Sequence, residues 1–150
     1  METTDVKFRS FVAEDILRKQ TLRNVYTPKL IEYKQMTIVY IDFSYMKNRE
    51  EIYTAIDVAG AFIRRHPLKS LFVLTNISGM FYNNEVFNHL TAYAKANTPH
   101  VRASAVVGMA GMMQIFYNGF TRLTGREVKA FTTEIEAKEY LLAQSKNPVI

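Results

Sequence analysis

The chain contains no cysteine and no tryptophan, and it has four prolines and six glycines among its 150 residues. Because cysteine is absent, disulfides, thiolate metal sites and cysteine nucleophiles are all excluded. A chain without cysteine fits a reducing compartment, so we expect a cytoplasmic protein. The length predicts one domain over residues 1–150, in which roughly 70% of the unfolded chain's surface can be buried without disulfides or metals.

Long apolar runs are also lacking. The most apolar run, residues 103–113, is about half of the ~20 residues that a membrane span requires, and it contains Gly108 and Gly111. The polar residues 1–5 lack the basic and then apolar pattern of a signal peptide. We therefore predict neither a transmembrane segment nor a secretory leader.

The formal charge is +5, from nineteen Lys and Arg against fourteen Asp and Glu. A positive balance can favour an acidic partner, a phosphate or a nucleic acid. However, the basic residues are spread from Lys7 to Lys146, and Arg64 and Arg65 are the only adjacent arginines. Scattered charge of this kind usually solvates the surface, so we predict no nucleic-acid binding.

Strand and helix patterns alternate from residue 37 onward. The predicted strands are rich in β-branched and apolar residues, and they cover residues 37–43, 70–75, 101–107 and 127–131. The helices between them begin at good capping residues or at a glycine turn: Asn48, Asn83 or Asn84, the turn 108–111, and Thr133. Short connections between such units imply right-handed crossovers and parallel later strands.

All four of these helices have a predicted apolar face. Apolar residues recur at helical spacing, and the sets are Ile52, Ala55, Ile56, Ala59 and Ile63; Val86, Phe87, Leu90 and Ala94; Met112, Ile115, Phe116, Phe120 and Leu123; and Ala137, Tyr140 and Leu141. Gly125 is placed to end the third of these helices in a left-handed conformation.

The first 36 residues have a weaker pattern, which predicts an irregular N-terminal extension or an edge hairpin. Residues 5–12 are compatible with a strand and residues 13–22 with a short helix. Residues 30–33 are compatible with a hairpin partner of the strand at 37–43, which makes the sheet mixed. We therefore expect an α/β fold with a mixed four- to five-stranded sheet flanked by about four helices.

Polar side chains follow the predicted parallel strands, at the edge of the sheet where α/β proteins bind ligands. The glycine turn also places free N–H groups at a helix N-terminus, which is a generic anion site. The alternative is that Asn, Ser and Thr close turns there, and that the glycines allow close packing. The candidate ligand- or partner-binding residues are Asp42, Ser44, Thr75, Asn76, Ser78, Asn83, Asn84, Gly108, Met109 and Gly111.

No motif for catalysis or metal binding is visible. His66, His89 and His100 are far apart and form no pair at the spacing of metal ligands. The sequence has no nucleophile elbow, no phosphate-binding loop and no dinucleotide fingerprint. We predict a protein that is not an enzyme and has no cofactor. Ten Phe and nine Tyr, and a soft apolar group around Met109, predict a filled core, a dimer face or an apolar pocket.

Residues 97–108, NTPHVRASAVVG, resemble the SpoIIAA-like branch of the STAS superfamily, whose founding members are anti-sigma-factor antagonists. The resemblance continues through Gly111, Tyr117-Asn118, Gly125-Arg126 and residues 136–141, and it covers about two-thirds of the chain, residues 37–142. It is similar to the form found in uncharacterised bacterial proteins. It implies a mixed sheet flanked by helices, no catalytic residues, and kinship with the CRAL-TRIO fold, which accommodates apolar ligands.

One position departs from that family. Antagonist members carry a phosphorylated serine just before the second helix, whereas residues 81–86 here read FYNNEV. A phosphate switch works because phosphorylation adds nearly two negative charges at a helix N-terminus. The side chains of Asn83 and Asn84 cannot accept a phosphate group. We therefore expect a non-catalytic STAS-like binding or regulatory module with a protein partner, which includes self-association as a homodimer. The alternative is a carrier of a small apolar or anionic ligand, a lipid or a nucleotide, in a pocket at the strand carboxyl ends.

Overall fold

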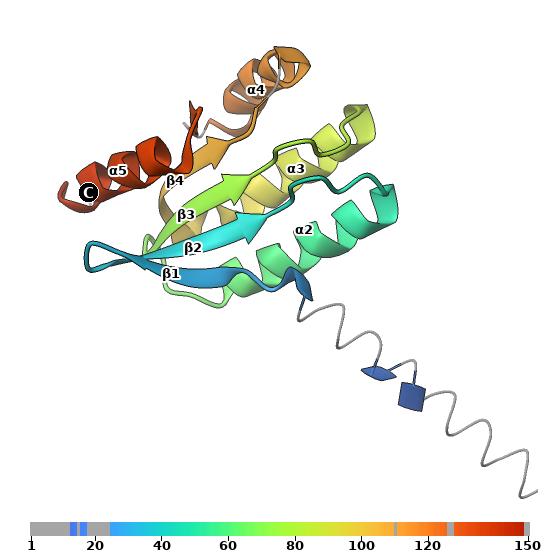
Figure 1. Ribbon diagram of the computed structural model, residues 1–150, viewed down its shortest axis with the longest axis horizontal. Coiled ribbons are helices and arrows are strands. Elements are labelled where there is room, and N and C mark those ends of the chain that lie inside the picture. Colours follow the sequence, from blue (N-terminus) through green and yellow to red (C-terminus); the bar gives the residue numbers. More distant parts are fainter. Residues whose placement is uncertain (1–12, 15, 18–24, 110, 126–127, 149–150) are drawn as a thin grey trace, which may run out of the picture.

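The computed structural model describes residues 13–14, 16–17, 25–109, 111–125 and 128–148 (Figure 1). Its strands are β1 (Lys29–Tyr33), β2 (Met36–Asp42), β3 (Leu71–Asn76), β4 (Val101–Val107) and β5 (Lys129–Phe131). Its helices are α2 (Arg49–Arg64), α3 (Asn84–Asn97), α4 (Gly111–Thr124) and α5 (Glu134–Ser145), with a short 3-10 turn at Thr98–His100. The expected α/β fold with a mixed sheet and four helices is confirmed.

The five strands form one sheet in the order β1-β2-β3-β4-β5. β1 pairs antiparallel with β2, and the remaining neighbours pair in parallel. The hairpin between β1 and β2, which the sequence allowed as one option, is therefore present. Its two turn residues, Lys34 and Gln35, have φ values of 47° and 70°.

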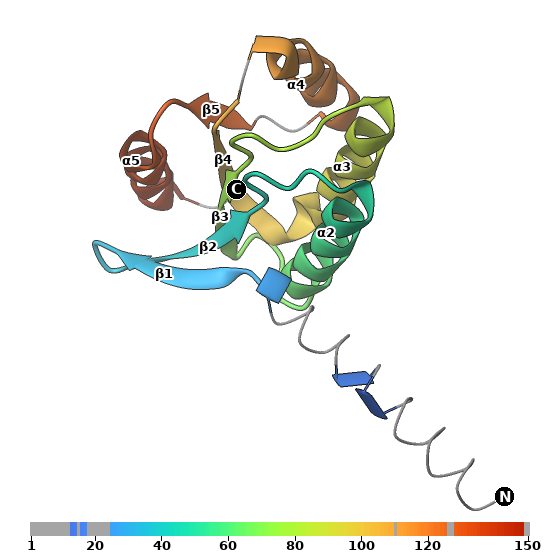
Figure 2. The same ribbon diagram turned by 45° about the vertical axis from the view of Figure 1, so that its right-hand side comes forward.

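Helices cover both faces of the sheet (Figure 2). One face packs against α2 and α3, through side chains such as Val39, Ile41 and Ile52. The other face packs against α5, through Ile38 and Leu141 among others. Neighbouring residues of β2 thus serve opposite cores, because successive side chains of a strand point to opposite faces.

The predicted buried face of α2 is correct at all five positions: Ile52, Ala55, Ile56, Ala59 and Ile63 are buried. In α5, Ala137 and Leu141 are buried and Tyr140 is half-buried. The prediction for α4 is wrong at Leu123, which is 57% exposed. The side chains of Met112, Ile115 and Phe116 lie outside the described residues.

The helices are capped by residues that the sequence predicted as caps. The side chain of Asn48 accepts hydrogen bonds from the N–H groups of Glu50 and Glu51. Asn83, rather than Asn84, caps α3, and Thr133 accepts from the N–H of Glu136 at 3.2 Å. These bonds satisfy N–H groups that the first helical turn leaves without a partner.

The rest of the N-terminal prediction falls largely on residues that the structure does not describe. The expected strand at 5–12 lies outside the described residues. Of the expected helix at 13–22, Ala13, Glu14, Ile16 and Leu17 are helical, and the other positions lie outside the described residues. No helix within the described part of the chain has the length and apolar character needed to cross a membrane.

Candidate functional site

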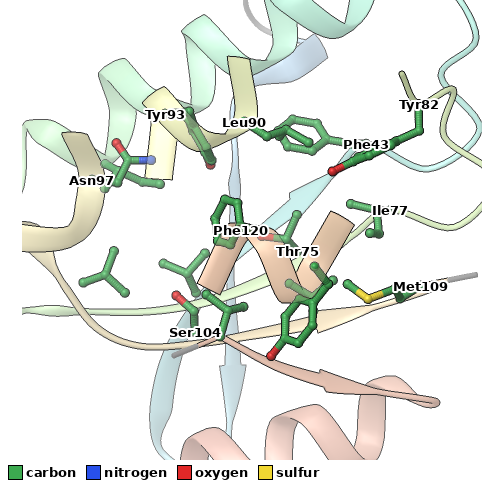
Figure 3. A pocket seen from close by; sticks show the side chains of 16 residues that line it. Phe43, Thr75, Ile77, Tyr82, Leu90, Tyr93, Asn97, Ser104, Met109 and Phe120 are labelled. Carbon is green, nitrogen blue, oxygen red and sulfur yellow. The ribbon is translucent and has the colours of Figure 1, made fainter. Parts of the chain in front are cut away.

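An apolar pocket of about 100 Å³ lies between the sheet and helices α3 and α4 (Figure 3). Strands β3 and β4 contribute Thr75 and Val106 among others, α3 contributes Leu90 and Tyr93, and α4 contributes Phe120. α4 packs against α3. The pocket therefore joins four elements that follow one another along the chain.

Aromatic rings form part of a mostly apolar lining. They come from Phe43, Tyr82, Tyr93, Tyr117 and Phe120. Phe43 and Tyr93 meet edge to face, with ring centroids 6.3 Å apart and planes at 65°, which is a favourable arrangement for aromatic pairs. Five aromatic rings thus line one apolar cavity, a type of site that small ligands occupy.

Tyr82 belongs to this lining and has a perturbed hydroxyl group. Burial raises its pKa to about 12, since removal from water disfavours the charged phenolate. Its ring also lies near that of Phe87, with centroids 6.5 Å apart. The phenol is therefore neutral near pH 7 and presents a polar hydroxyl beside an apolar cavity.

Asn97 is the most deeply buried polar residue of the lining, with an exposed fraction of 1%. It is the last residue of α3. Its Oδ1 accepts a hydrogen bond from Nη1 of Arg64 at 3.0 Å. The amide is therefore held in place from the end of α2.

The chemistry available in this pocket is limited. None of the described residues that line it carries a carboxylate, an imidazole, an amine or a guanidinium group. Elsewhere in the described ranges, no group of three or more His, Asp or Glu side chains could hold a metal ion. The pocket offers hydroxyl groups and one amide, which can orient a ligand.

The candidate residues at the ends of β2 and β3 make hydrogen bonds within the turn that follows each strand. Oδ1 of Asp42 accepts from the backbone N–H of Ser44 at 2.9 Å, and also from its hydroxyl group. Oδ1 of Asn76 accepts from the N–H of Ser78 at 3.0 Å, and its Nδ2 donates to the hydroxyl of Tyr40 at 3.2 Å. The bonds of Asn76 and Ser78 fit the alternative in which Asn, Ser and Thr close the turns, and Asp42 closes the turn after β2 in the same way.

The remaining candidate residues lie in the apolar pocket, at the start of α3, or in the glycine turn that leads to α4. Thr75 and Met109 line the apolar pocket. Asn83 accepts from the N–H of Val86 at 2.9 Å as the helix cap, and Asn84 is the exposed first residue of α3. Gly108 has a φ of +87° and packs directly on Ser78, and Gly111 begins α4.

A second, more polar hollow of about 240 Å³ lies beside the carboxyl end of β2 and contains Asp42 and Ser44. Its walls include Tyr26, Tyr40 and Glu51. The hydroxyl of Tyr40 donates to Oε1 of Glu134 at 2.8 Å, and burial is the largest cause that raises its pKa to about 12. Asp42 and Ser44 thus line a different hollow from Thr75 and Met109, and the other described candidates are not among the lining residues of either hollow.

The three histidines have local partners. The ring of His89 stacks on that of Tyr53, with centroids 3.8 Å apart and planes at 12°. Nδ1 of His66 lies 2.9 Å from the carbonyl oxygen of Phe62, and Nδ1 of His100 lies 2.7 Å from that of His66. His100 belongs to the 3-10 turn before β4 rather than to the strand.

Sequence reasoning missed most of the pocket. Tyr93, Ser104 and Phe120 were not among the candidate binding residues, and Asn97 entered only as the first residue of the segment 97–108 that resembles the STAS superfamily. A polar residue that interrupts the apolar face of a helix was the available signal for Asn97.

Comparison with known proteins gives no match: no family model, no curated protein and no solved structure matches this chain. The fold and the two hollows are therefore the features from which a function can be inferred.

Proposed function

We propose that this chain is a non-catalytic binding module that holds a small apolar ligand in the pocket between the sheet and helices α3 and α4. The aromatic lining of that pocket carries the proposal. The absence of acidic, basic and imidazole groups among its described lining residues favours binding over chemistry, because the hydroxyl groups of the lining have no adjacent base there to activate them.

The size of the pocket limits the ligand. An engineered apolar cavity of about 150 Å³ stays dry and binds benzene, and this pocket measures about 100 Å³. A ligand with one ring or a short branched chain fits that scale better than a whole lipid. A nucleotide or another anion is disfavoured, since no positive side chain belongs to the described lining.

Ligand-induced stabilisation tests this proposal. A library of single-ring aromatic compounds is screened by thermal shift, and compounds that raise the Tm are confirmed by native mass spectrometry. A ligand at 100 times its Kd stabilises the native state by about 2.7 kcal/mol. The proposal fails if no compound of this class raises the Tm or forms a complex with the protein.

A matched pair of variants locates the binding. Val106 lines the pocket and is half-buried, so Val106→Phe is expected to fill it and to abolish binding. Leu142 is also half-buried but packs against the core on the α5 face of the sheet, so Leu142→Phe is the control and should keep the ligand. Binding that survives Val106→Phe unchanged would contradict the proposed pocket.

A protein-interaction role on a STAS-like scaffold is the second candidate, and two exposed aromatic side chains favour it. Tyr45 is 72% exposed and Phe81 is 39% exposed. The turns that carry them are joined, because the N–H of Tyr45 donates to the carbonyl of Ser78 at 2.7 Å and that of Phe81 donates to the carbonyl of Met46 at 2.8 Å. Aromatic residues are enriched where proteins bind each other.

Sedimentation velocity tests the self-association form of this second candidate. If these aromatic residues form the interface, the double variant Tyr45→Ser, Phe81→Ser is expected to shift the protein from dimer to monomer. Leu68→Ser, which removes another exposed apolar side chain, should leave the sedimentation coefficient unchanged. A wild-type protein that is monomeric at all accessible concentrations would exclude self-association through this surface.

A further inference from the structure

The hollow of about 240 Å³ beside the carboxyl end of β2 differs in composition from the apolar pocket. The two share none of their described lining residues. The wall of this hollow includes three tyrosines and two carboxylates, which are Tyr26, Tyr40, Tyr45, Asp42 and Glu51. Aromatic faces attract organic cations, and carboxylates supply the opposite charge. The composition of the hollow therefore favours a positively charged ligand.

Tyr45 has a backbone conformation that a bulky residue rarely adopts. Its φ is 59°, in the left-handed region, where a residue other than glycine is strained. Burial of the ring does not account for this strain, because the residue is 72% exposed. The N–H of Tyr45 donates to the carbonyl oxygen of Ser78 at 2.7 Å and fixes the turn. Strained residues cluster at functional sites, and this one places an exposed aromatic ring at the wall of the hollow.

Gly79 gives the ring of Tyr45 the room that it needs. A Cβ on Gly79 would lie 2.5 Å from Cδ1 and 2.7 Å from Cε1 of Tyr45, so a larger residue would displace the ring. The ring is therefore supported by the turn after β3 as well as by its own turn. A side chain that is exposed and yet supported in this way is suited to contact a ligand.

The turn after β2 does not need the charge of Asp42. Oδ1 of Asp42 accepts from the N–H of Ser44 at 2.9 Å. The turn after β3 is closed in the same way by Asn76, whose Oδ1 accepts from the N–H of Ser78 at 3.0 Å. Because a neutral amide is enough to close such a turn, the negative charge of Asp42 is left to act on the hollow that it lines.

The two carboxylates act on the tyrosines of the hollow. Burial and then the charge of Glu51 raise the pKa of Tyr26. Burial is the largest cause that raises the pKa of Tyr40, and the charge of Asp42 adds to it. Lys29 contributes one positive charge to the lining, against the two negative ones. The negative field that disfavours phenolate also attracts a cation.

We infer that this hollow binds a small organic cation with an alkylated ammonium group. The tyrosine rings contact its alkyl groups, which are apolar and share the positive charge, and Asp42 and Glu51 balance that charge. A bare metal ion is disfavoured, because the described part of the chain holds no group of three or more His, Asp or Glu side chains that could bind one. The inference goes beyond the proposed function and does not depend on the apolar pocket.

Two probes of the same shape test the charge of the ligand. Choline carries a trimethylammonium group, and 3,3-dimethyl-1-butanol has a carbon atom in place of the nitrogen and no charge. Affinities are measured by calorimetry or ligand-observed NMR, at one ionic strength set with sodium chloride. Sodium then competes at any site that does not select alkyl groups. We expect choline to bind about 5-fold or more tightly than the alcohol. Equal affinities, or no binding of choline, would overturn the inference.

Matched carboxylate variants locate the binding. The double variant Asp42→Asn, Glu51→Gln removes both charges, and the amide at position 42 keeps the acceptor that closes the turn. We expect this variant to lose the preference for choline. Glu50→Gln is the control, since Glu50 also belongs to the first turn of α2 but is not among the described lining residues of the hollow. A preference that survives in the double variant, or falls equally in the control, would refute this site.

Single variants test the lysine and the aromatic ring separately. Lys29→Ala removes the positive charge of the lining, so choline should bind about 2-fold or more tightly; an unchanged or lower affinity would contradict the electrostatic argument. Tyr45→Leu keeps an apolar side chain but removes the aromatic face, so it should weaken choline more than the alcohol. Phe81→Ser, which changes an exposed aromatic residue outside the described lining, should leave both affinities unchanged. Equal losses for the two probes in Tyr45→Leu would refute the contact between the cation and the ring.

A free cation and the head group of a lipid share this chemistry, and flotation with phosphatidylcholine vesicles distinguishes them. Choline binding without co-flotation assigns the site to a free cation. Co-flotation that the double carboxylate variant abolishes assigns it to a lipid head group.

Discussion

Gly108 lies so close to Ser78 that a Cβ on it would be 2.1 Å from Oγ of Ser78 and 2.5 Å from the backbone nitrogen of the same residue. The turn after β4 therefore packs directly on the turn after β3. Gly108 also has a φ of +87°, a conformation that other residues rarely adopt. Both observations give this glycine a structural role at the edge of the sheet where the candidate residues gather.

Gly108→Ala is expected to destabilise the protein by about 3 kcal/mol or more, since it adds a steric overlap to the strain of a positive φ. Gly125 is the matched control, because it has a φ of +65° and a Cβ added to it would meet no atom within 4 Å. Gly125→Ala should therefore cost only about 1–2 kcal/mol. Urea unfolding measures both values, and equal losses would refute the close packing on Ser78.

Gln35→Gly is expected to stabilise the protein by about 1 kcal/mol. Gln35 has a φ of 70° in the turn between β1 and β2, and a residue with a Cβ is strained in that conformation by about 1–2 kcal/mol. The substitution leaves the ion pair of Lys34 with Glu139, at 2.6 Å, in place. Gln35→Val should destabilise, and a Gln35→Gly variant with an unchanged or lower urea midpoint contradicts this account of the turn.

Asn83→Ala is expected to cost about 1 kcal/mol of stability, because it removes the side chain that caps α3. Asn83→Asp should keep most of that stability, since a carboxylate caps equally well and is favoured by the helix dipole. Thermal and urea unfolding distinguish the two. If Asn83→Asp abolishes the binding of a pocket ligand while it preserves stability, Asn83 has a binding role beyond the cap.

Stability is expected to fall as the pH rises from about 10 to 12. Burial raises the pKa of both Tyr40 and Tyr82 to about 12, above the ordinary value of 10.0. The native state therefore holds these protons more tightly than the unfolded state does, and this contribution is fully present below pH 10 and is lost as the pH approaches 12. Urea unfolding across this range measures the loss.

Phenylalanine variants test whether the two tyrosines cause the loss of stability at alkaline pH. Tyr82→Phe and Tyr40→Phe each remove one group that titrates late, so each should flatten the fall in stability, and the double variant should flatten it further. The ultraviolet absorbance of phenolate should show the same late titration in the wild type. A profile that keeps its full slope in the double variant would contradict the assignment.

The sequence predicted the parallel part of the fold because burial leaves a periodic pattern. The face of α2 from Ile52 to Ile63 is apolar at helical spacing, and β4 is an apolar run with buried residues on both faces. The sequence indicated β1 only as one possible interpretation of residues 30–33, since Lys34-Gln35 is not the Asn-Gly or Asp-Gly pair that marks a two-residue hairpin turn. Leu123 was misplaced because apolar spacing does not indicate where along a helix the contact with its neighbours ends, and Leu123 is one residue before the last residue of α4.

The pocket could not be predicted in the same way. Periodicity indicates that Phe43, Leu90, Val106 and Phe120 point inward, but it does not indicate whether inward side chains fill the space between them. That depends on how far α4 lies from the sheet. The polar turns at the strand ends were visible in the sequence, yet Thr75 and Met109 are the only two candidate residues among the described lining of the apolar pocket.

The two outer strands have a consequence for aggregation. A strand at the edge of a sheet can pair with a strand of another molecule, and natural proteins prevent this with short edge strands and with lysines. β5 at one edge is three residues long, and β1 at the other begins with Lys29 and is followed by Lys34 in the turn. Charged lysines at this edge oppose the pairing of β1 with a strand of a second copy. We therefore expect self-association to use a surface other than the edges of the sheet, and both edges oppose growth into a fibre.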